Sequence, residues 1–262
     1  MSYRYGGGLI ALGLAFGLSM PFAGAAPGIS AIENAKPEDW PSYHRTYDAH
    51  RYSPLSGINK GNVGKLGVAW VHQGGENTQG LQATPVVLDG VVYYSASFNR
   101  VFAVDGKTGM EIWHYFPKIK DGVEKLPTAP YNRGVTVANG NVYIGTMDGR
   151  AIALDQKTGK VKWESQLVDA MKCGCLFTSP PLAVKDKLIF GSTQGGIPAR
   201  GGGIFGLDQA TGKKLWYFDP VKEGPEHWGI NSFGKLQGQT LVWDSRTLVN
   251  GLLHGDCVTI TG

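Results

Sequence analysis

An eleven-residue unit occurs three times in this chain and constrains its fold more than any other feature. The unit has a small residue, an aspartate two positions later, a Thr-Gly pair after two further residues and a tryptophan at its end. Its tryptophans follow one another at intervals of 50 and 53 residues, and they are Trp113, Trp163 and Trp216. A repeat of roughly 40 to 50 residues is typical of the four-stranded blades of a β-propeller. The repeat therefore predicts an all-β fold built from blades.

Each repeat has the sequence pattern of four antiparallel strands. In the first repeat, residues 91–97 and 100–105 are rich in β-branched and aromatic residues, which favour strands. Residues 83–90 predict an earlier strand that ends in an Asp-Gly turn, and residues 105–109 predict a turn opened by aspartate and closed by glycine. The side chain of Trp113 then lies on one defined face of the last strand, because successive side chains alternate between the two faces. The same pattern places the second blade at about residues 133–164 and the third at about 178–218.

One further tryptophan lies upstream of the repeats. Residues 67–72 contain Trp70, but no aspartate-opened turn precedes it. We expect a single outer strand of a blade that both chain ends complete, which would avoid open sheet edges. The fold class is thus a partial β-propeller of about three blades plus one strand of a closing blade. Closed propellers have roughly 4 to 8 blades, so we expect this chain to be a fragment of a longer protein.

Composition agrees with a turn-rich β domain and excludes one class of partner. Glycine accounts for 39 of the 262 residues, about twice its usual share of roughly 7%, without the strict period of a fibrous protein. The net charge is +4, and the lysines are scattered through turns. We therefore expect no nucleic-acid binding.

The N-terminus has the pattern of an export signal. An apolar run follows Arg4, and residues 23–25 have the small-x-small form of a cleavage site. We expect a cleavable signal peptide at residues 1–25, a flexible leader at 26–39, a periplasmic location and no stable membrane insertion. The apolar run is shorter than the roughly 18 residues of a spanning helix, which favours cleavage over an uncleaved anchor.

The three cysteines lie in a chain that is expected to meet an oxidising compartment. Cys173 and Cys175 are the plausible local pair, and the sequence leaves a disulfide and two free thiols equally open. A metal site at this pair is a weaker interpretation, because no second ligand pair accompanies it. No serine-hydrolase, Walker or dinucleotide-binding motif is present, so redox chemistry would need a bound cofactor other than NAD.

The repeated unit resembles the tryptophan-docking motif of the pyrroloquinoline quinone (PQQ) dependent alcohol dehydrogenases. Further similarities are residues 40–54, which open with Trp-Pro-Ser-Tyr-His, and residues 131–134, Tyr-Asn-Arg-Gly. The resemblance covers about residues 38–228 and implies an N-terminal part of an eight-bladed periplasmic quinoprotein, with the propeller at 40–228 and an atypical or truncated segment at 229–262. It also implies PQQ on the central axis with a Ca²⁺ or lanthanide ion, an alcohol substrate that gives up hydride, and cytochrome c or a similar electron acceptor.

The resemblance carries some cofactor-binding residues over to this chain. Arg133 matches an arginine that contacts PQQ, and Thr178 matches a PQQ-binding threonine. Thr193, Gln194 and Gly195 match a loop at the cofactor edge, and Gln82 lies where the family usually has a glutamate that touches PQQ. The structural alternatives are an arginine at a strand end in solvent and ordinary polar residues at strand starts.

The chain also departs from the family pattern. Gly196 stands where the family has its first metal-ligating glutamate, Pro127 and Thr128 stand where adjacent cysteines are expected, and the cysteine pair falls one blade later. The resemblance assigns no catalytic or metal-binding residue here, so we expect this chain by itself to be incomplete and inactive. A noncatalytic propeller of the same repeat type, serving as an outer-membrane assembly scaffold, is the alternative function. A carbohydrate-binding propeller is a third.

Overall fold

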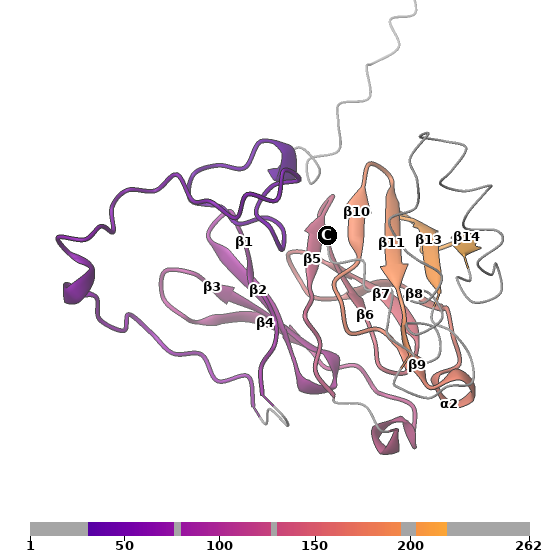
Figure 1. Cartoon of the computed structure of the whole chain (residues 1–262). Coiled ribbons are helices and arrows are strands. Elements are labelled where there is room, and N and C mark those ends of the chain that lie inside the picture. Colours follow the sequence, from indigo (N-terminus) through magenta and orange to yellow (C-terminus); the bar gives the residue numbers. More distant parts are fainter. Residues whose placement is uncertain (1–30, 76–79, 127–129, 195–202, 219–262) are drawn as a thin grey trace, which may run out of the picture.

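The computed structural model describes residues 31–75, 80–126, 130–194 and 203–218, and it contains three four-stranded antiparallel sheets (Figure 1). Blade 1 consists of β1 (Val86–Leu88), β2 (Val91–Ala96), β3 (Arg100–Asp105) and β4 (Glu111–Tyr115). Blade 2 consists of β5 (Thr136–Ala138), β6 (Asn141–Gly145), β7 (Arg150–Asp155) and β8 (Val161–Gln166). Blade 3 consists of β10 (Leu182–Val184), β11 (Lys187–Gly191), β13 (Ile204–Asp208) and β14 (Lys214–Phe218). The predicted fold class is confirmed.

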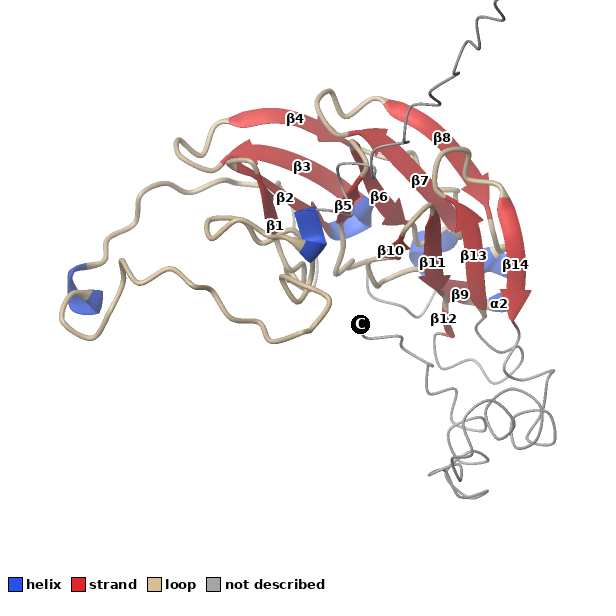
Figure 2. Cartoon of the chain, turned by 90° about the horizontal axis from the view of Figure 1, so that it is seen from above, coloured by secondary structure: helices blue, strands red, loops and turns tan. Residues whose placement is uncertain are grey.

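The three blades stand side by side, with their first strands inside and their last strands outside (Figure 2). β1, β5 and β10 form the inner edge, and β4, β8 and β14 form the outer arc. Apolar residues of neighbouring blades fill the space between them. Val101 and Ile144, from blades 1 and 2, belong to one buried cluster, and Ala153 and Leu207, from blades 2 and 3, belong to the next. Full burial of a Val, Leu or Ile side chain such as Val101, Ile144 or Leu207 stabilises the fold by about 1.5–3 kcal/mol.

Two kinds of turn set the strand order inside a blade. Asp89 and Gly90, between β1 and β2, have φ values of 50° and 78°, the left-handed pair that a type I′ hairpin turn requires. Between β3 and β4, the Asp105 carboxylate accepts hydrogen bonds from the backbone and the hydroxyl of Thr108 at 2.7 and 2.8 Å. Asp155 and Asp208 form the same turn in blades 2 and 3. The turns predicted from the repeat are therefore confirmed.

Each repeated tryptophan that is covered docks on the turn of the following blade. The indole N–H of Trp113 donates to Gln156 O at 3.0 Å, and the ring lies on Gly159, where a Cβ would come within 2.6 Å of it. Trp163 makes the same contacts with the blade 3 turn, its indole 3.2 Å from Gln209 O. Trp216 is 44% exposed. The repeat thus joins blades as well as building them.

The segment around Trp70 docks as a blade edge but is not a strand. The indole of Trp70 donates to Gly106 O at 3.1 Å and covers Gly109 of the blade 1 turn, as the other tryptophans do. Residues 66–74 nevertheless have no regular secondary structure. The strand expected at 67–72 is therefore wrong for this chain, because a strand needs a ladder partner and no other strand of the described residues pairs with this segment.

The N-terminal described residues lie along the inner edge of the blades. Trp40 bridges to Val87 of β1, and the Tyr47 hydroxyl donates to Ala183 O of β10 at 2.7 Å. Ile32 is 2% exposed, so this part of the segment expected to be a flexible leader packs against the fold. The expected signal peptide at 1–25 and the segment at 229–262 lie outside the described residues. No described helix is long and apolar enough to cross a membrane.

The remaining elements are short. The 3-10 helices are η1 (Val63–Lys65), η2 (Ser97–Asn99) and η3 (Val123–Lys125). Between blades 2 and 3 the chain forms α2 (Ala170–Cys173) and β9 (Cys175–Leu176), and β9 pairs with β12 (Thr193–Gln194) in a separate two-stranded sheet. The sequence pattern did not predict this small sheet, because two-residue strands leave no periodicity to detect.

Candidate functional site

The segments that lead into β1, β5 and β10 lie side by side at the inner edge of the blades. The Thr84 N–H donates to Arg133 O at 3.4 Å, and the Arg133 N–H donates to Thr178 O at 2.7 Å. These three residues precede the innermost strand of their own blade by two to four positions. The structure therefore brings together Arg133 and Thr178, two of the residues that the resemblance assigns to cofactor binding.

Buried polar side chains fix the loop that carries Arg133. Asn132 is 1% exposed; its amide donates to Gly145 O at 2.8 Å, and its Oδ1 accepts the Gly134 N–H at 2.7 Å. The buried Ser95 hydroxyl lies 3.0 and 2.7 Å from the carbonyl oxygens of Asn132 and Gly134. Because a buried polar group without a partner costs about 1–3 kcal/mol, these bonds hold the loop in one position.

The Arg133 side chain is half-buried between an aromatic ring and a hydroxyl. Its guanidinium carbon lies 4.7 Å from the centre of the Tyr131 ring, and one terminal nitrogen lies 3.4 Å from Thr178 Oγ1. Among the described residues, no carboxylate forms an ion pair with this guanidinium. A held cation with unused N–H donors and a neighbouring hydroxyl is suited to bind an anion or a carbonyl-rich ligand.

The other predicted site residues are placed to different degrees. Thr193 lies on β12, and its hydroxyl donates to Leu176 O at 3.1 Å, two residues before Thr178. The backbone of Gln194 pairs in register with Cys175. Gln82 is exposed four residues before β1. The side chain of Gln194 and all of Gly195 lie outside the described residues.

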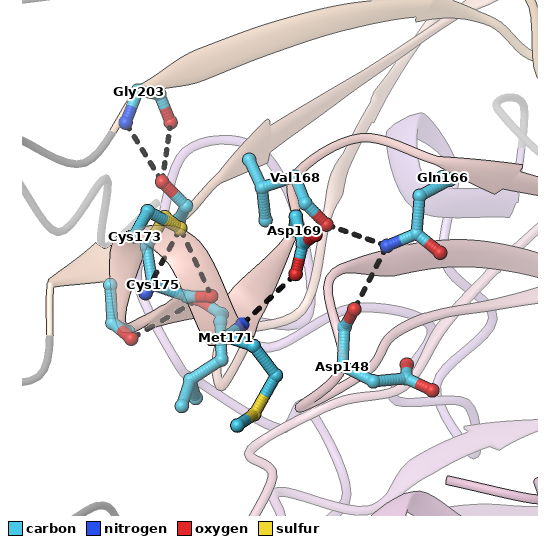
Figure 3. The surroundings of a disulfide bond; sticks show 11 residues. Asp148, Gln166, Val168, Asp169, Met171, Cys173, Cys175 and Gly203 are labelled. Atoms are coloured by element: carbon cyan, nitrogen blue, oxygen red, sulfur yellow. Dashed lines mark hydrogen bonds between the residues drawn. A yellow bond between two sulfur atoms is a disulfide. The ribbon is translucent and has the colours of Figure 1, made fainter. Parts of the chain in front are cut away.

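The cysteine pair forms a disulfide that ends three residues before Thr178 (Figure 3). Cys173 and Cys175 are bonded, with their Cα atoms 5.1 Å apart. The structure thus decides between the two states that the sequence left open. Pro127 and Thr128, where the resemblance expects adjacent cysteines, lie outside the described residues, as does Gly196.

Two residues near the candidate site were not singled out from the sequence. Ser95 and Asn99 are buried polar residues that brace the site, and the Asn99 amide donates to Gly145 O at 3.3 Å. A serine and an asparagine at the end of a strand give no signal by themselves, since such residues are common in turns. Only the fold shows that Ser95 contacts the Arg133 loop and that Asn99 shares the Gly145 acceptor with Asn132.

A metal site is not formed by the described residues. No group of three or more His, Cys, Asp or Glu side chains in the described segments is arranged to hold a metal ion. A hard cation such as Ca²⁺ needs several oxygen ligands at once. We therefore assign no metal ligand to these segments.

Comparison with known proteins identifies the family. Residues 40–248 match the PQQ family described as "Glucose/ethanol/alcohol dehydrogenase, beta-propeller domain". The chain belongs to this family. The resemblance drawn from the repeat is thereby confirmed for this quinoprotein chain, and the match extends about twenty residues beyond the segment on which it was based.

The relatives and solved structures agree on family and fold. The quinoprotein chain is 39% identical over 247 residues to the quinohemoprotein alcohol dehydrogenase ADH IIB of Pseudomonas putida, a match that covers 87% of the chain and 35% of the relative. The crystal structure of quinohemoprotein alcohol dehydrogenase from Comamonas testosteroni superposes with a TM-score of 0.63 at 38% identity, covering 74% of the chain and 30% of that protein. A europium-containing methanol dehydrogenase superposes with a TM-score of 0.66 at 32% identity, covering 73% and 33%. The chain thus spans about a third of the length of these relatives.

Proposed function

We propose that this quinoprotein chain supplies the first blades of a PQQ-dependent alcohol dehydrogenase, and that its inner edge binds PQQ through Arg133 and Thr178. The observation that carries the proposal is the half-buried guanidinium of Arg133, which no described carboxylate neutralises and which Thr178 flanks at 3.4 Å. The family match and the names of the relatives, which are quinohemoprotein alcohol dehydrogenases, support PQQ as the ligand.

The chemistry of the donors fits this cofactor. PQQ carries carboxylates and quinone oxygens, and a guanidinium binds such groups in charge-assisted hydrogen bonds. Thr178 is 6% exposed, and its hydroxyl can donate to a ligand oxygen as well as accept from Arg133. Thr193, Gln194, Gly195 and Gln82 remain proposed contacts around the same edge.

Bound PQQ would supply the hydride acceptor for oxidation of an alcohol, while this chain's own residues bind and orient it. The Arg133 guanidinium would hold negative charge on the ligand, and the buried Asn132 and Ser95 would keep the loop that carries Arg133 in place. Because the described residues provide no metal ligands, we derive no step through Ca²⁺ or a lanthanide; one solved neighbour is a europium-containing enzyme.

The cellular setting follows the same proposal. An alcohol is the proposed substrate, cytochrome c or a similar protein the proposed electron acceptor, and the periplasm the proposed location. The apolar run that follows Arg4 supports export. The noncatalytic scaffold is not favoured, because the relatives named above are dehydrogenases.

The test is titration of PQQ into the protein purified with everything that its gene encodes, with and without Ca²⁺ or a lanthanide. Arg133→Ala should weaken PQQ binding by about 1.5–3 kcal/mol, or roughly 10- to 150-fold, because it removes a charge-assisted contact. The backbone bonds of residue 133 survive this change, so the blades should stay assembled.

Two matched variants sharpen the test. Arg133→Lys keeps the charge and loses the planar fork, so its affinity should fall between those of the wild type and Arg133→Ala. Lys162→Ala removes one positive charge from the outer strand β8 and should leave affinity unchanged. Equal affinities for wild type and Arg133→Ala would remove Arg133 from the site. Absence of PQQ binding under every metal condition would overturn the proposed function.

A further inference from the structure

The disulfide lies at the start of β9, a strand that leads to Thr178 and pairs with the strand of Thr193. Cys173 is the last residue of α2, and Cys175 is the first residue of β9, which continues directly to Thr178. On its other side, β9 pairs with β12, which carries Thr193. Figure 3 shows the bonded Cys173 and Cys175 with the residues around them. Whatever fixes β9 therefore acts on both threonines.

The β9–β12 ladder is short, although β9 also buries Leu176, which is 1% exposed. The ladder consists of two residue pairs, Thr193 with Leu176 and Gln194 with Cys175, together with the hydroxyl bond from Thr193 to Leu176 O. Even a complete two-stranded hairpin is only marginally stable in water. The covalent bond between Cys173 and Cys175 ties the first residue of β9 to α2, and so it limits the freedom of a strand that its ladder cannot hold alone.

The two cysteines differ in exposure. Cys175 is 3% exposed, whereas Cys173 is half-buried and follows the exposed Met171 and Lys172. An incoming thiolate would therefore reach the sulfur of Cys173. The backbone N–H of Cys175 lies 3.1 Å from Cys173 Sγ and points toward it. A hydrogen bond of this kind stabilises negative charge on that sulfur after reduction.

We propose that Cys173–Cys175 is a thiol–disulfide exchange site whose redox state controls the order of the β9–β12 sheet and, through Thr178 and Thr193, the affinity of the PQQ site. The link to affinity rests on the proposed function; the link to β9–β12 does not. The partner is a dithiol, either a small molecule or a dithiol-carrying protein domain.

The exchange balances in two steps. One thiolate of the dithiol attacks Cys173 Sγ, and the Cys173–Cys175 bond breaks. Cys175 leaves as a free thiolate, and Cys173 is now joined to the dithiol in a mixed disulfide. The second thiolate of the dithiol then attacks its own bonded sulfur, closes a disulfide within the reductant and releases Cys173. The two protons lost by the dithiol pass to the two cysteines, so the protein gains two electrons and the dithiol is oxidised.

The structural half of the proposal is tested by hydrogen–deuterium exchange on a Cys257→Ser chain, oxidised and then reduced with dithiothreitol. Alkylation should label two thiols after reduction and none before. Amide exchange in peptides that contain Leu176 and Thr193 should accelerate at least tenfold on reduction, while β6 and β7 of blade 2 stay unchanged as the internal control. Failure of dithiothreitol to open the bond in the folded chain, or unchanged exchange at β9 and β12, would overturn the proposal.

The functional half is tested by PQQ titration of the complete gene product in both redox states. Reduction should weaken PQQ binding about tenfold, and reoxidation should restore it. The double variant Cys173→Ser/Cys175→Ser should behave as the reduced protein; if it does not fold, reduction of the wild type gives the same comparison. No PQQ binding in either state would contradict the proposed function, but it would not affect the result on thiol–disulfide exchange. Equal PQQ affinity in both states, with binding intact, would sink the proposed control of affinity.

Discussion

The outer ends of blade 1 and blade 3 have the same sequence motif and opposite environments. Trp113 and Trp216 occupy equivalent positions on β4 and β14, and each faces a one-residue register shift in the preceding strand. Trp113 is 8% exposed because the turn of blade 2 covers it, whereas Trp216 is 44% exposed. The motif is therefore half of an interaction. Its tryptophan and its turn belong to neighbouring blades, and one blade completes the next.

The turn is the other half, and it is formed locally. Asp105, Asp155 and Asp208 bind the threonine three positions later in the same way, whether their blade's tryptophan is covered or exposed. Local hydrogen bonds thus prepare each docking surface before a neighbour arrives. Among the described residues, the difference in exposure between Trp113 and Trp216 follows from whether the turn of a next blade covers the ring.

The largest expected effect is at the covered tryptophan. Trp113→Ala removes a buried indole and its hydrogen bond to Gln156, so it should lower the free energy of unfolding by about 3–5 kcal/mol. Urea unfolding of the purified chain, followed by circular dichroism, would measure the loss. A loss no greater than that of Trp216→Ala would contradict the interpretation that docking distinguishes the two residues.

The glycine under the tryptophan should come next. Gly159 has φ of 69°, and an added Cβ would lie 2.6 Å from the Trp113 ring, so Gly159→Ala should cost about 1–3 kcal/mol from overpacking and about 1 kcal/mol more from the left-handed backbone. Gly90→Ala is the matched control. Gly90 has φ of 78° with open space around its Cβ position, so it isolates the backbone cost. Equal melting temperatures for the two variants would show that docking of the indole does not depend on the absence of a Cβ at residue 159.

The exposed tryptophan should matter little in this chain. Trp216→Ala should change the free energy of unfolding by no more than about 1 kcal/mol, because the side chain makes few buried contacts. Acrylamide should also quench the fluorescence of Trp216 more strongly than that of Trp113, measured in single-tryptophan variants. Strong protection of Trp216 would mean that residues outside the described segments cover it.

The smallest effect concerns pH and the turns. The hydroxyl of Thr108 lowers the pKa of Asp105, and the hydroxyl of Thr211 lowers the pKa of Asp208 in the same way. A lowered folded pKa gives stability above the unfolded value of about 3.9, and this stability is lost as the pH falls through the folded pKa.

Replacement of either threonine by valine should raise the pKa of its aspartate and flatten the loss of stability below about pH 4. NMR titration of the aspartate carboxyl would measure the shift. Because the turn is local, Thr108→Val and Thr211→Val should behave alike, in contrast to the two tryptophans. A shift at only one of them would show that the neighbouring blade, and not the local hydroxyl, sets the pKa.

The candidate site shows where prediction from sequence reaches its limit. The resemblance placed Arg133 and Thr178 in one site, and the structure joins them by a backbone hydrogen bond of 2.7 Å. The resemblance gave no indication that Ser95 and Asn132 hold the loop that carries Arg133, because burial of a polar side chain depends on residues dozens of positions away. The strand expected around Trp70 was wrong for the same reason, since pairing needs a partner that the segment itself does not contain.

The sequence alone determined the number of described blades, the aspartate-opened turns and the docking tryptophans. These features follow from local alternation, turn chemistry and a repeat, all of which lie within some fifty residues. The tertiary structure decided which tryptophans are covered, that Cys173 and Cys175 are bonded, and that β9 pairs with β12 beside the proposed cofactor edge. Those outcomes depend on contacts between segments far apart in the chain, and only the packing of one blade against the next brings such segments together.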